Sequence, residues 1–285
     1  MSLPRRPGPS TRTRVHEYVD GTIVRHEDRL ATEEPLEVRC GWPGTPPYQV
    51  AVTMRTPGHD FELAAGFLYA ERTLTGPEAL HTVAYCTEES LPPDQEHNVV
   101  TVSLRSAPPR VPAVRYDGPS ASSSACGVCG TQSIDDVLAL AEVFGAKAAH
   151  PPVSPAVLHG LPARLRAEQR VFDRTGGLHA AGLFTVDGDP LVVREDIGRH
   201  NAVDKVVGAR ILGGDHPSAP VLAVSGRIGF EIVQKAVAAG VGVLAAVGAP
   251  SSLAVDLAER AGLCVVGFLR VNRFVAYSAG ERIGV

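Results

Sequence analysis

The chain has 285 residues, of which 44% are hydrophobic and 20% charged, as is usual for a folded protein with a sizeable core. Its formal net charge of −4 excludes the chain-wide basic field that is typical of duplex nucleic-acid binders. The opening residues carry no apolar run after their charges, and the longest apolar stretches are too short to span a bilayer. We therefore expect a cytoplasmic protein with no nucleic-acid and no membrane partner.

The first part of the chain predicts a tail and a small domain. Residues 1–13 are rich in proline, arginine and serine, which indicates a disordered tail. Residues 14–105 predict a small α+β domain. A helix is expected from Asp60, as its cap, to Leu68. Strands are expected at 21–30, 36–40, 48–54 and 98–104.

Two cysteines follow a linker. Residues 106–125 are dense in proline, serine and glycine, as linkers often are. Cys126 and Cys129 stand at its far end in SSSACGVCG, just before a helix expected from Ser133. A thiol before a helix N-terminus has a lowered pKa, because the amide dipoles favour the thiolate. The five cysteines of the chain are an odd number, which favours free thiols over a disulfide framework.

The rest of the chain, residues 126–285, predicts a larger α/β domain. Apolar runs at 178–186 and 190–195 indicate two strands joined by the turn DGD. Helices are then expected at 199–212, 228–240 and 251–262, and strands at 220–226, 241–247 and 263–270. Strands and helices that alternate at this spacing favour parallel β-α-β units in a layered α/β domain.

The cysteine pair permits three interpretations. A zinc site needs about four ligands, and no second Cys-x-x-Cys and no His-x-Glu accompanies the pair. A dithiol oxidoreductase usually has an aromatic residue beside its first cysteine, whereas glycines flank this pair. A sulfur carrier needs a reactive thiolate that bulky partners can approach, which flanking glycines permit. The two thiols can also be idle.

Polar turns follow four of the expected strands. In parallel strands such turns meet at one edge of the sheet, where ligands bind, and glycines and arginines there suit phosphate. Neither a dinucleotide fingerprint nor a P-loop occurs, so NAD is not expected. The turns suggest a large phosphorylated ligand such as a nucleotide. Their polar residues are Asp196, Arg199, His200, Asn201, Ser225, Arg227, Ser251, Ser252, Arg270 and Arg273.

These motifs resemble a known family. In chain order, MRTPGHDFELAAGFLYAE, ACGVCG, REDIGRHNAVDKVVG, SGRIGFEIVQKAVAAG and GFLRVNRFVAY are similar to the FdhD family of formate dehydrogenase accessory sulfurtransferases. The resemblance implies a cytidine-deaminase-like larger domain without zinc or any other metal site. It also implies a homodimer that takes sulfur from a cysteine desulfurase as a persulfide. The acceptor would be the molybdenum (or tungsten) of bis-molybdopterin guanine dinucleotide, which then enters formate dehydrogenase.

The resemblance also assigns roles to residues. Cys126 is expected to carry the persulfide, with Cys129 assisting. The cofactor-binding stretch corresponds to Phe268, Leu269, Arg270, Val271, Asn272 and Arg273. The chain departs from the family in the turn SGRIGFE, where Ile228-Gly229 stands in place of the more usual Thr-Ser. Two alternatives remain, namely a chaperone that delivers the cofactor without transferring sulfur, and a dithiol oxidoreductase.

Overall fold

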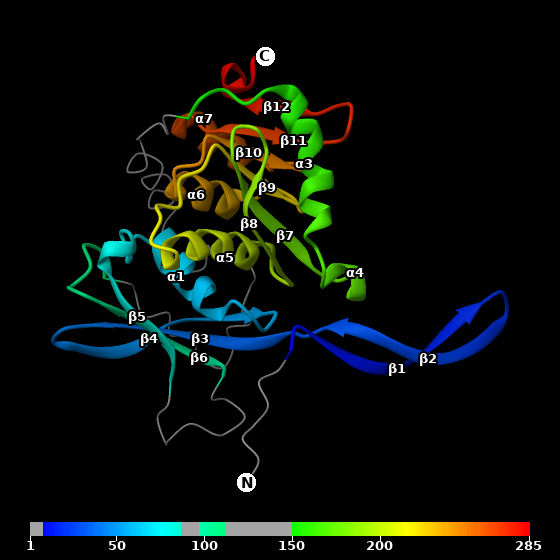
Figure 1. Cartoon of the computed structure of the whole chain (residues 1–285), viewed down its shortest axis with the longest axis horizontal. Coiled ribbons are helices and arrows are strands. Elements are labelled where there is room, and N and C mark those ends of the chain that lie inside the picture. Colours follow the sequence, from blue (N-terminus) through cyan, green and yellow to red (C-terminus); the bar gives the residue numbers. More distant parts are fainter. Residues whose placement is uncertain (1–7, 87–96, 112–149) are drawn as a thin grey trace, which may run out of the picture.

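The computed structural model describes residues 8–86, 97–111 and 150–285. Its secondary structure is mixed α/β, as expected. Figure 1 shows two sheets with helices between them, and a long two-stranded arm that projects from one side. No helix in the described part of the chain is long and apolar enough to cross a membrane.

The first part forms a four-stranded sheet in the order β4-β3-β6-β5. Its strands are β3 (Glu34–Trp42), β4 (Thr45–Arg55), β5 (Leu80–Tyr85) and β6 (Val99–Leu104), with the short η1 (Pro77–Ala79) before β5. Helix α1 (Asp60–Ala70) covers one face and buries Leu63, Ala64 and Leu68. The predicted helix is thus confirmed. Its cap is wrong by one residue, because His59 occupies the cap position and Asp60 is the first helical residue.

The arm consists of β1 (Ser10–Val19) and β2 (Thr22–Ala31), which pair only with each other among the described residues. β1 begins inside the segment that we expected to be a disordered tail to residue 13, so that expectation is wrong from Ser10 onward. The sequence of β1 is largely polar and contains no buried residue, so it lacks the apolar alternation that marks most strands.

The second part forms a six-stranded sheet in the order β12-β11-β10-β9-β7-β8. The strands are β7 (His179–Phe184), β8 (Pro190–Asp196), β9 (Val221–Val224), β10 (Val243–Ala246), β11 (Cys264–Gly267) and β12 (Val275–Ser278). β9, β10 and β11 are parallel neighbours. β7 runs antiparallel to β9, and β12 runs antiparallel to β11. The sheet is therefore mixed, with the expected parallel units at its centre.

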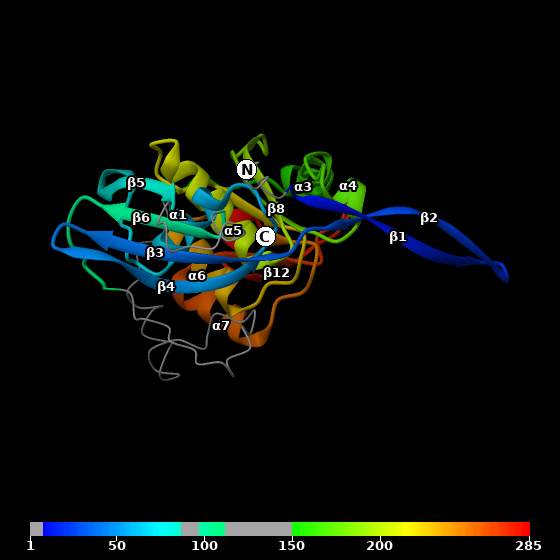
Figure 2. The ribbon, with the colours of Figure 1, turned by 90° about the horizontal axis from the view of Figure 1, so that it is seen from below.

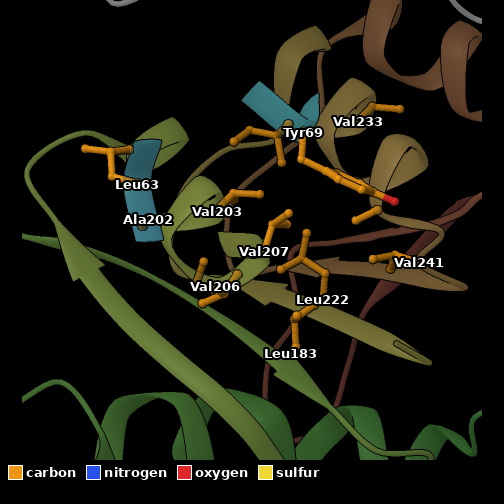
Figure 3. Packing of buried hydrophobic residues seen from close by; sticks show 14 of the residues in the cluster. Leu63, Tyr69, Leu183, Ala202, Val203, Val206, Val207, Leu222, Val233 and Val241 are labelled. Carbon is orange, nitrogen blue, oxygen red and sulfur yellow. The ribbon is translucent and has the colours of Figure 1, made fainter. Parts of the chain in front are cut away.

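Helices cover both faces of this sheet. α5 (Arg199–Leu212), α6 (Phe230–Ala239) and α7 (Ser252–Ala261) pack on the face toward α1, and α3 (Pro155–Ala167) packs on the other. The short α4 (Phe172–Thr175) precedes β7, and η3 (Gly280–Ile283) ends the chain. Figure 3 shows the core between α1, α5 and the sheet, to which Leu63, Val203, Val207 and Leu222 all contribute. One hydrophobic cluster thus joins the small and the large part.

Candidate functional site

Four polar turns converge at one edge of the six-stranded sheet. β8 is antiparallel to β7, and β7 is antiparallel to β9, so β8 points the same way as β9, β10 and β11. The turns that follow these four strands therefore lie at the same edge. β7 starts at this edge with His179, because it runs in the opposite direction.

The turns after β9, β10 and β11 stack backbone against backbone. The amide of Gly248 donates to the carbonyl oxygen of Gly226 at 3.1 Å, and the amide of Phe268 donates to the carbonyl oxygen of Gly248 at 3.0 Å. A Cβ atom at Gly248 would lie 2.7 Å from the Gly226 oxygen, so only glycine permits this approach. Backbone groups of three turns are thereby brought into one compact surface.

Three basic side chains surround Gly226 at this surface. A Cβ atom there would lie 3.2 Å from Nδ1 of His179 and 3.8 Å from Cβ of Arg199. Burial, followed by the charges of Arg199 and Arg227, lowers the pKa of His179 below its ordinary value. Among the described residues, Nε of Arg199 is buried and has no hydrogen-bond partner. An anion would satisfy this nitrogen and offset the mutual repulsion of the basic groups.

Helix N-termini add further donors. The caps of α5 and α6 are Gly198 and Gly229, and within the described part of the chain neither end has a side-chain cap hydrogen bond. The first amides of such helices lack intrahelical acceptors, which suits a bound anion. The N-terminus of α7 is different, because Oγ of Ser251 accepts a hydrogen bond from the amide of Ala254 at 3.3 Å. Ser252, the first residue of α7, is exposed.

Asp196 organises the site without facing it. Its side chain is completely buried, and its Oδ2 lies 2.6 Å from Nζ of Lys205. The carboxylate also accepts hydrogen bonds from Gly198, Asn201 and Thr56. The prediction that Asp196 contacts a ligand is therefore corrected, because the carboxylate is fully used in holding the turn after β8 to the segment after β4.

His200 and Ser225 also build the wall of the site. Nε2 of His200 lies 3.0 Å from Oε2 of Glu231, and both side chains are largely buried. This contact ties the first turn of α5 to the first turn of α6. Oγ of Ser225 accepts a hydrogen bond from the amide of Ala180 at 2.9 Å, which extends the pairing of β7 with β9. Both side chains join structural elements that frame the basic surface.

The stretch from Phe268 to Arg273 divides into buried and exposed residues. Leu269 is 2% exposed and its side chain packs in the core, so only its backbone is placed to take part in the predicted cofactor-binding stretch. Nη1 of Arg270 donates to the carbonyl oxygens of Val247 and Leu269, both at 2.8 Å, which braces the loop. Phe268 is 39% exposed and has a φ of 51°, a backbone conformation that is uncommon for an aromatic residue. Val271, Asn272 and Arg273 are exposed.

Comparison with known proteins shows the family to which the chain belongs. The model of the FdhD/NarQ family matches residues 31–284. The chain belongs to the FdhD/NarQ family. A relative from Streptomyces coelicolor, named sulfur carrier protein FdhD, is 49% identical over 276 residues, which cover 96% of this chain and 95% of the relative. A relative of the same name from Mycobacterium tuberculosis is 46% identical, and the alignment covers 95% of this chain and 97% of the relative.

A solved structure supports the fold of this FdhD/NarQ protein. The crystal structure of a Desulfotalea psychrophila protein, described as a formate dehydrogenase accessory protein, aligns with a TM-score of 0.72 at 22% identity. The alignment covers 96% of this chain and 99% of the Desulfotalea psychrophila chain. The cytidine-deaminase-like layering that the sequence resemblance implied stays a prediction.

The cysteines of this family member fall into two groups. Cys126 and Cys129, with the helix expected from Ser133, lie outside the described residues. The three described cysteines are buried, and burial raises the pKa of Cys40 and of Cys264 to about 12. Sγ of the third, Cys86, lies 3.7 Å from Nη1 of Arg39. Within residues 8–86, 97–111 and 150–285, no cluster of three or more metal-binding side chains occurs.

Sequence reasoning missed two contributors to the site. His179 stands at the start of a strand that runs toward the opposite edge, so a rule based on strand ends does not find it. Thr56 belongs to the small part of the molecule, yet its Oγ1 accepts from the amide of Ile197 at 3.1 Å. The only sequence feature around Thr56 was the motif TPGHD, which predicted the start of a helix and not a contribution to the site.

Proposed function

We propose that this protein is a sulfur carrier required for formate dehydrogenase activity. In this proposal Cys126 takes sulfur from a cysteine desulfurase as a persulfide. The sulfur then passes to the molybdenum of bis-molybdopterin guanine dinucleotide, which binds at the basic edge of the six-stranded sheet. Relatives that are 45–49% identical over nearly the whole chain are named sulfur carrier protein FdhD, which supports the class of activity.

The observation that carries the proposal is the buried Nε of Arg199, which lies beside His179 and Arg227 and has no hydrogen-bond partner among the described residues. Each guanine dinucleotide contains a diphosphate that joins its pterin part to guanosine, and guanidinium groups and helix N-terminal amides are the donors that phosphate prefers. Phe268 is exposed in the adjoining turn and offers an aromatic ring to a planar base or pterin. The acceptor is a substrate here, since it arrives, receives sulfur and leaves.

The pKa values of two buried thiols, Cys40 and Cys264, support the choice of carrier. The nucleophile in sulfur transfer is a thiolate, and a thiol with a pKa of about 12 is protonated at neutral pH. Cys40 and Cys264 are therefore unsuited to the task. Cys126 and Cys129 stand among glycines and before an expected helix N-terminus, which is the environment that favours a thiolate.

The proposed chemistry balances in two steps. In the first, the thiolate of Cys126 attacks the outer sulfur of the desulfurase persulfide. A new S–S bond forms on Cys126, the bond in the donor breaks, and the donor leaves as a thiolate. In the second, the thiolate of Cys129 attacks the inner sulfur of the Cys126 persulfide. The pair becomes a disulfide, and the two electrons that it loses release the outer sulfur as hydrosulfide. The hydrosulfide replaces an oxygen ligand of the metal, which leaves as water, and a thiol reductant returns the disulfide to the dithiol.

Mass spectrometry of the purified protein after incubation with a cysteine desulfurase and cysteine tests the carrier role. We expect one added sulfur atom on the peptide that contains Cys126, and none on the peptides with Cys40 or Cys264. Cys126→Ala should lose this adduct and the ability to activate a co-expressed formate dehydrogenase. Cys86→Ala serves as the matched control and should keep both. Full activation by Cys126→Ala would refute the carrier role.

The homodimer and the cytoplasmic location stay predictions.

A further inference from the structure

The arm formed by β1 and β2 extends away from the body of the protein in both views (Figures 1 and 2). Its ten residue pairs run from Ser10↔Ala31 to Val19↔Thr22 without a shift of register. Its base is held by contacts of β2 with α4, and by the amide of Thr32, which donates to the carbonyl oxygen of Pro9 at 3.1 Å. A two-stranded ribbon without a covering layer is at best marginally stable in water, so a partner that covers one face would stabilise it.

The register of the arm separates its charges between two faces. Residues that pair directly point to the same face, and neighbours along a strand alternate between faces. All four arginines of the arm therefore lie on one face, which we call the arginine face, and the only acidic side chain there is Glu27. The formal charge of this face is thus +3. Its arginines are Arg12, Arg14, Arg25 and Arg29.

The opposite face of the arm is acidic. It carries Glu17 and Asp28 and neither arginine nor lysine. The ion pairs of the arm agree with this division. Nη1 of Arg12 lies 3.5 Å from Oε2 of Glu27 on the arginine face, and Nε2 of His26 lies 3.1 Å from Oε2 of Glu17 on the other. The arm is neutral as a whole and yet strongly basic on one side.

The arginine face has the composition of a protein–protein interface. Tyr18 pairs with Ile23 at its outer end, and these side chains are 73% and 67% exposed. Arginine and tyrosine are enriched in protein interfaces and supply most hot spots, whereas lysine, which is absent from this face, is depleted. Glu27 stands in the middle of the face, where it would repel a phosphate backbone. An acidic protein surface with an apolar spot therefore fits better than a nucleic acid.

The base of the arginine face adjoins the edge at which we propose that the cofactor binds. Ala31 belongs to this face, and a Cβ atom at Gly177 would lie 3.8 Å from Cβ of Ala31. Gly177 is only two residues before His179, which is part of that edge. A protein that takes the cofactor from this edge would thus approach beside the arm.

The size of the arm requires that its partner also contacts the body of the protein. Ten residue pairs span about 34 Å, and two strands are about 10 Å wide, which gives a face of roughly 340 Å². A stable interface covers about 800 Å² on each partner. The remaining area has to come from the body next to the base of the arm, which is the region of α4 and the cofactor edge.

We propose that the arginine face docks an acidic surface of the enzyme that receives the cofactor. This inference rests on the function proposed above, in which that enzyme is formate dehydrogenase. The receiving enzyme, rather than the sulfur donor, is assigned because the arm begins beside the cofactor edge. Opposite charges would speed the encounter and orient the enzyme toward the edge from which the cofactor leaves.

Biolayer interferometry of the full chain on immobilised, cofactor-free formate dehydrogenase tests the docking. We expect the dissociation constant to rise at least tenfold in Arg14→Thr/Arg25→Thr, which removes two positive charges from the arginine face. Thr11→Asp/Thr22→Asp is the matched control, because it changes the net charge equally on the opposite, exposed face. The control should change the constant less than twofold. Added salt should weaken wild-type binding more than that of the arginine variant.

Four results would overturn the proposal. They are no binding of the wild-type chain to the enzyme, equal binding by Arg14→Thr/Arg25→Thr, an equal loss in the control pair, and a loss of binding to the cysteine desulfurase instead. Equal enzyme binding together with an arginine-dependent affinity for a 20-nucleotide RNA would assign the face to nucleic acid.

Two further measurements keep the docking separate from the sulfur-carrier proposal. Sulfur uptake on Cys126 and the affinity for GDP should be the same in Arg14→Thr/Arg25→Thr as in the wild type, because the arm carries none of the residues of the basic edge. If the wild type itself failed both measurements, the proposed function would fall. If it passed both and the arginine variant still bound the enzyme normally, only the docking would fall.

Discussion

Nζ of Lys205 lies 2.6 Å from Oδ2 of Asp196, and both side chains are at most 1% exposed. The same ammonium group donates to the carbonyl oxygen of Thr56 at 2.9 Å. This buried pair therefore connects three elements, namely the end of β8, the first half of α5 and the segment that follows β4. The turn that carries Arg199 is held in place by it, so the geometry of the site depends on a contact between the two parts of the molecule.

Removal of the ammonium group should destabilise the protein strongly. Lys205→Met leaves the carboxylate of Asp196 buried without its cation, and such a loss typically costs about 3–5 kcal/mol. Urea denaturation should show a decrease of this size in the free energy of unfolding. The double variant Lys205→Met/Asp196→Asn removes both charges and should recover part of the lost free energy of unfolding. If Lys205→Met alone were as stable as the wild type, the pair would not be buried in solution.

Arg199 should contribute directly to nucleotide affinity. Its buried Nε has no partner among the described residues, so a phosphate can add a charge-assisted hydrogen bond there. We expect Arg199→Gln to weaken GDP binding by about 1.5–3 kcal/mol, which is roughly a ten- to hundredfold loss of affinity. Calorimetric titration measures this change. Arg25→Gln removes an exposed arginine on the arm and should leave the affinity as it is.

Arg270 and Arg273 should behave differently from each other. The guanidinium of Arg270 already donates to two carbonyl oxygens, whereas Arg273 is exposed at the same loop. We expect Arg273→Ala to lower GDP affinity with no change in melting temperature, and Arg270→Ala to lower the melting temperature as well. Equal melting temperatures for both variants would show that Arg270 does not brace the loop. Thermal unfolding and titration of the same preparations give both readouts.

Nucleotide binding should depend on the protonation of His179. Its pKa is lowered by burial and by Arg199 and Arg227, so the imidazole is neutral at pH 7.5 in the free protein. A bound phosphate favours the imidazolium, which means that binding takes up a proton and strengthens as the pH falls. Phosphate itself titrates near pH 6, so the change of GDP affinity with pH must be compared between the wild type and His179→Gln. If GDP affinity changes equally in both proteins between pH 7.5 and 5.5, the phosphate does not contact His179.

The sequence allowed most elements of both sheets to be predicted, because their apolar runs and glycine or proline boundaries are regular. β1 was missed because its side chains face solvent on both sides and leave no alternation. β12 was missed because it pairs with β11 after a turn at Phe268, and a positive φ at an aromatic residue has no sequence signal. The role of Asp196 was also hidden, since only the folded chain brings Lys205 and Thr56 to it.

The close crossing of α1 and α5 depends on two glycines. A Cβ atom at Gly208 of α5 would overlap the carbonyl oxygen of Glu62, and one at Gly66 of α1 would overlap the carbonyl oxygen of Asp204. Each glycine faces the backbone of the other helix, so neither clash is relieved by a side-chain rotation. The helices would have to move apart, and with them the core that joins the two sheets.

Gly208→Ala should therefore lower the free energy of unfolding by about 3 kcal/mol or more, although alanine is the better helix former. Gly160 provides the matched control, because it lies inside α3 and a Cβ atom there meets nothing closer than 3.8 Å. Gly160→Ala should stabilise the protein by about 0.5–1 kcal/mol through helix propensity alone. Urea denaturation of the two variants compares a packed with an open glycine. A gain of stability in both would mean that α1 and α5 do not touch through their backbones.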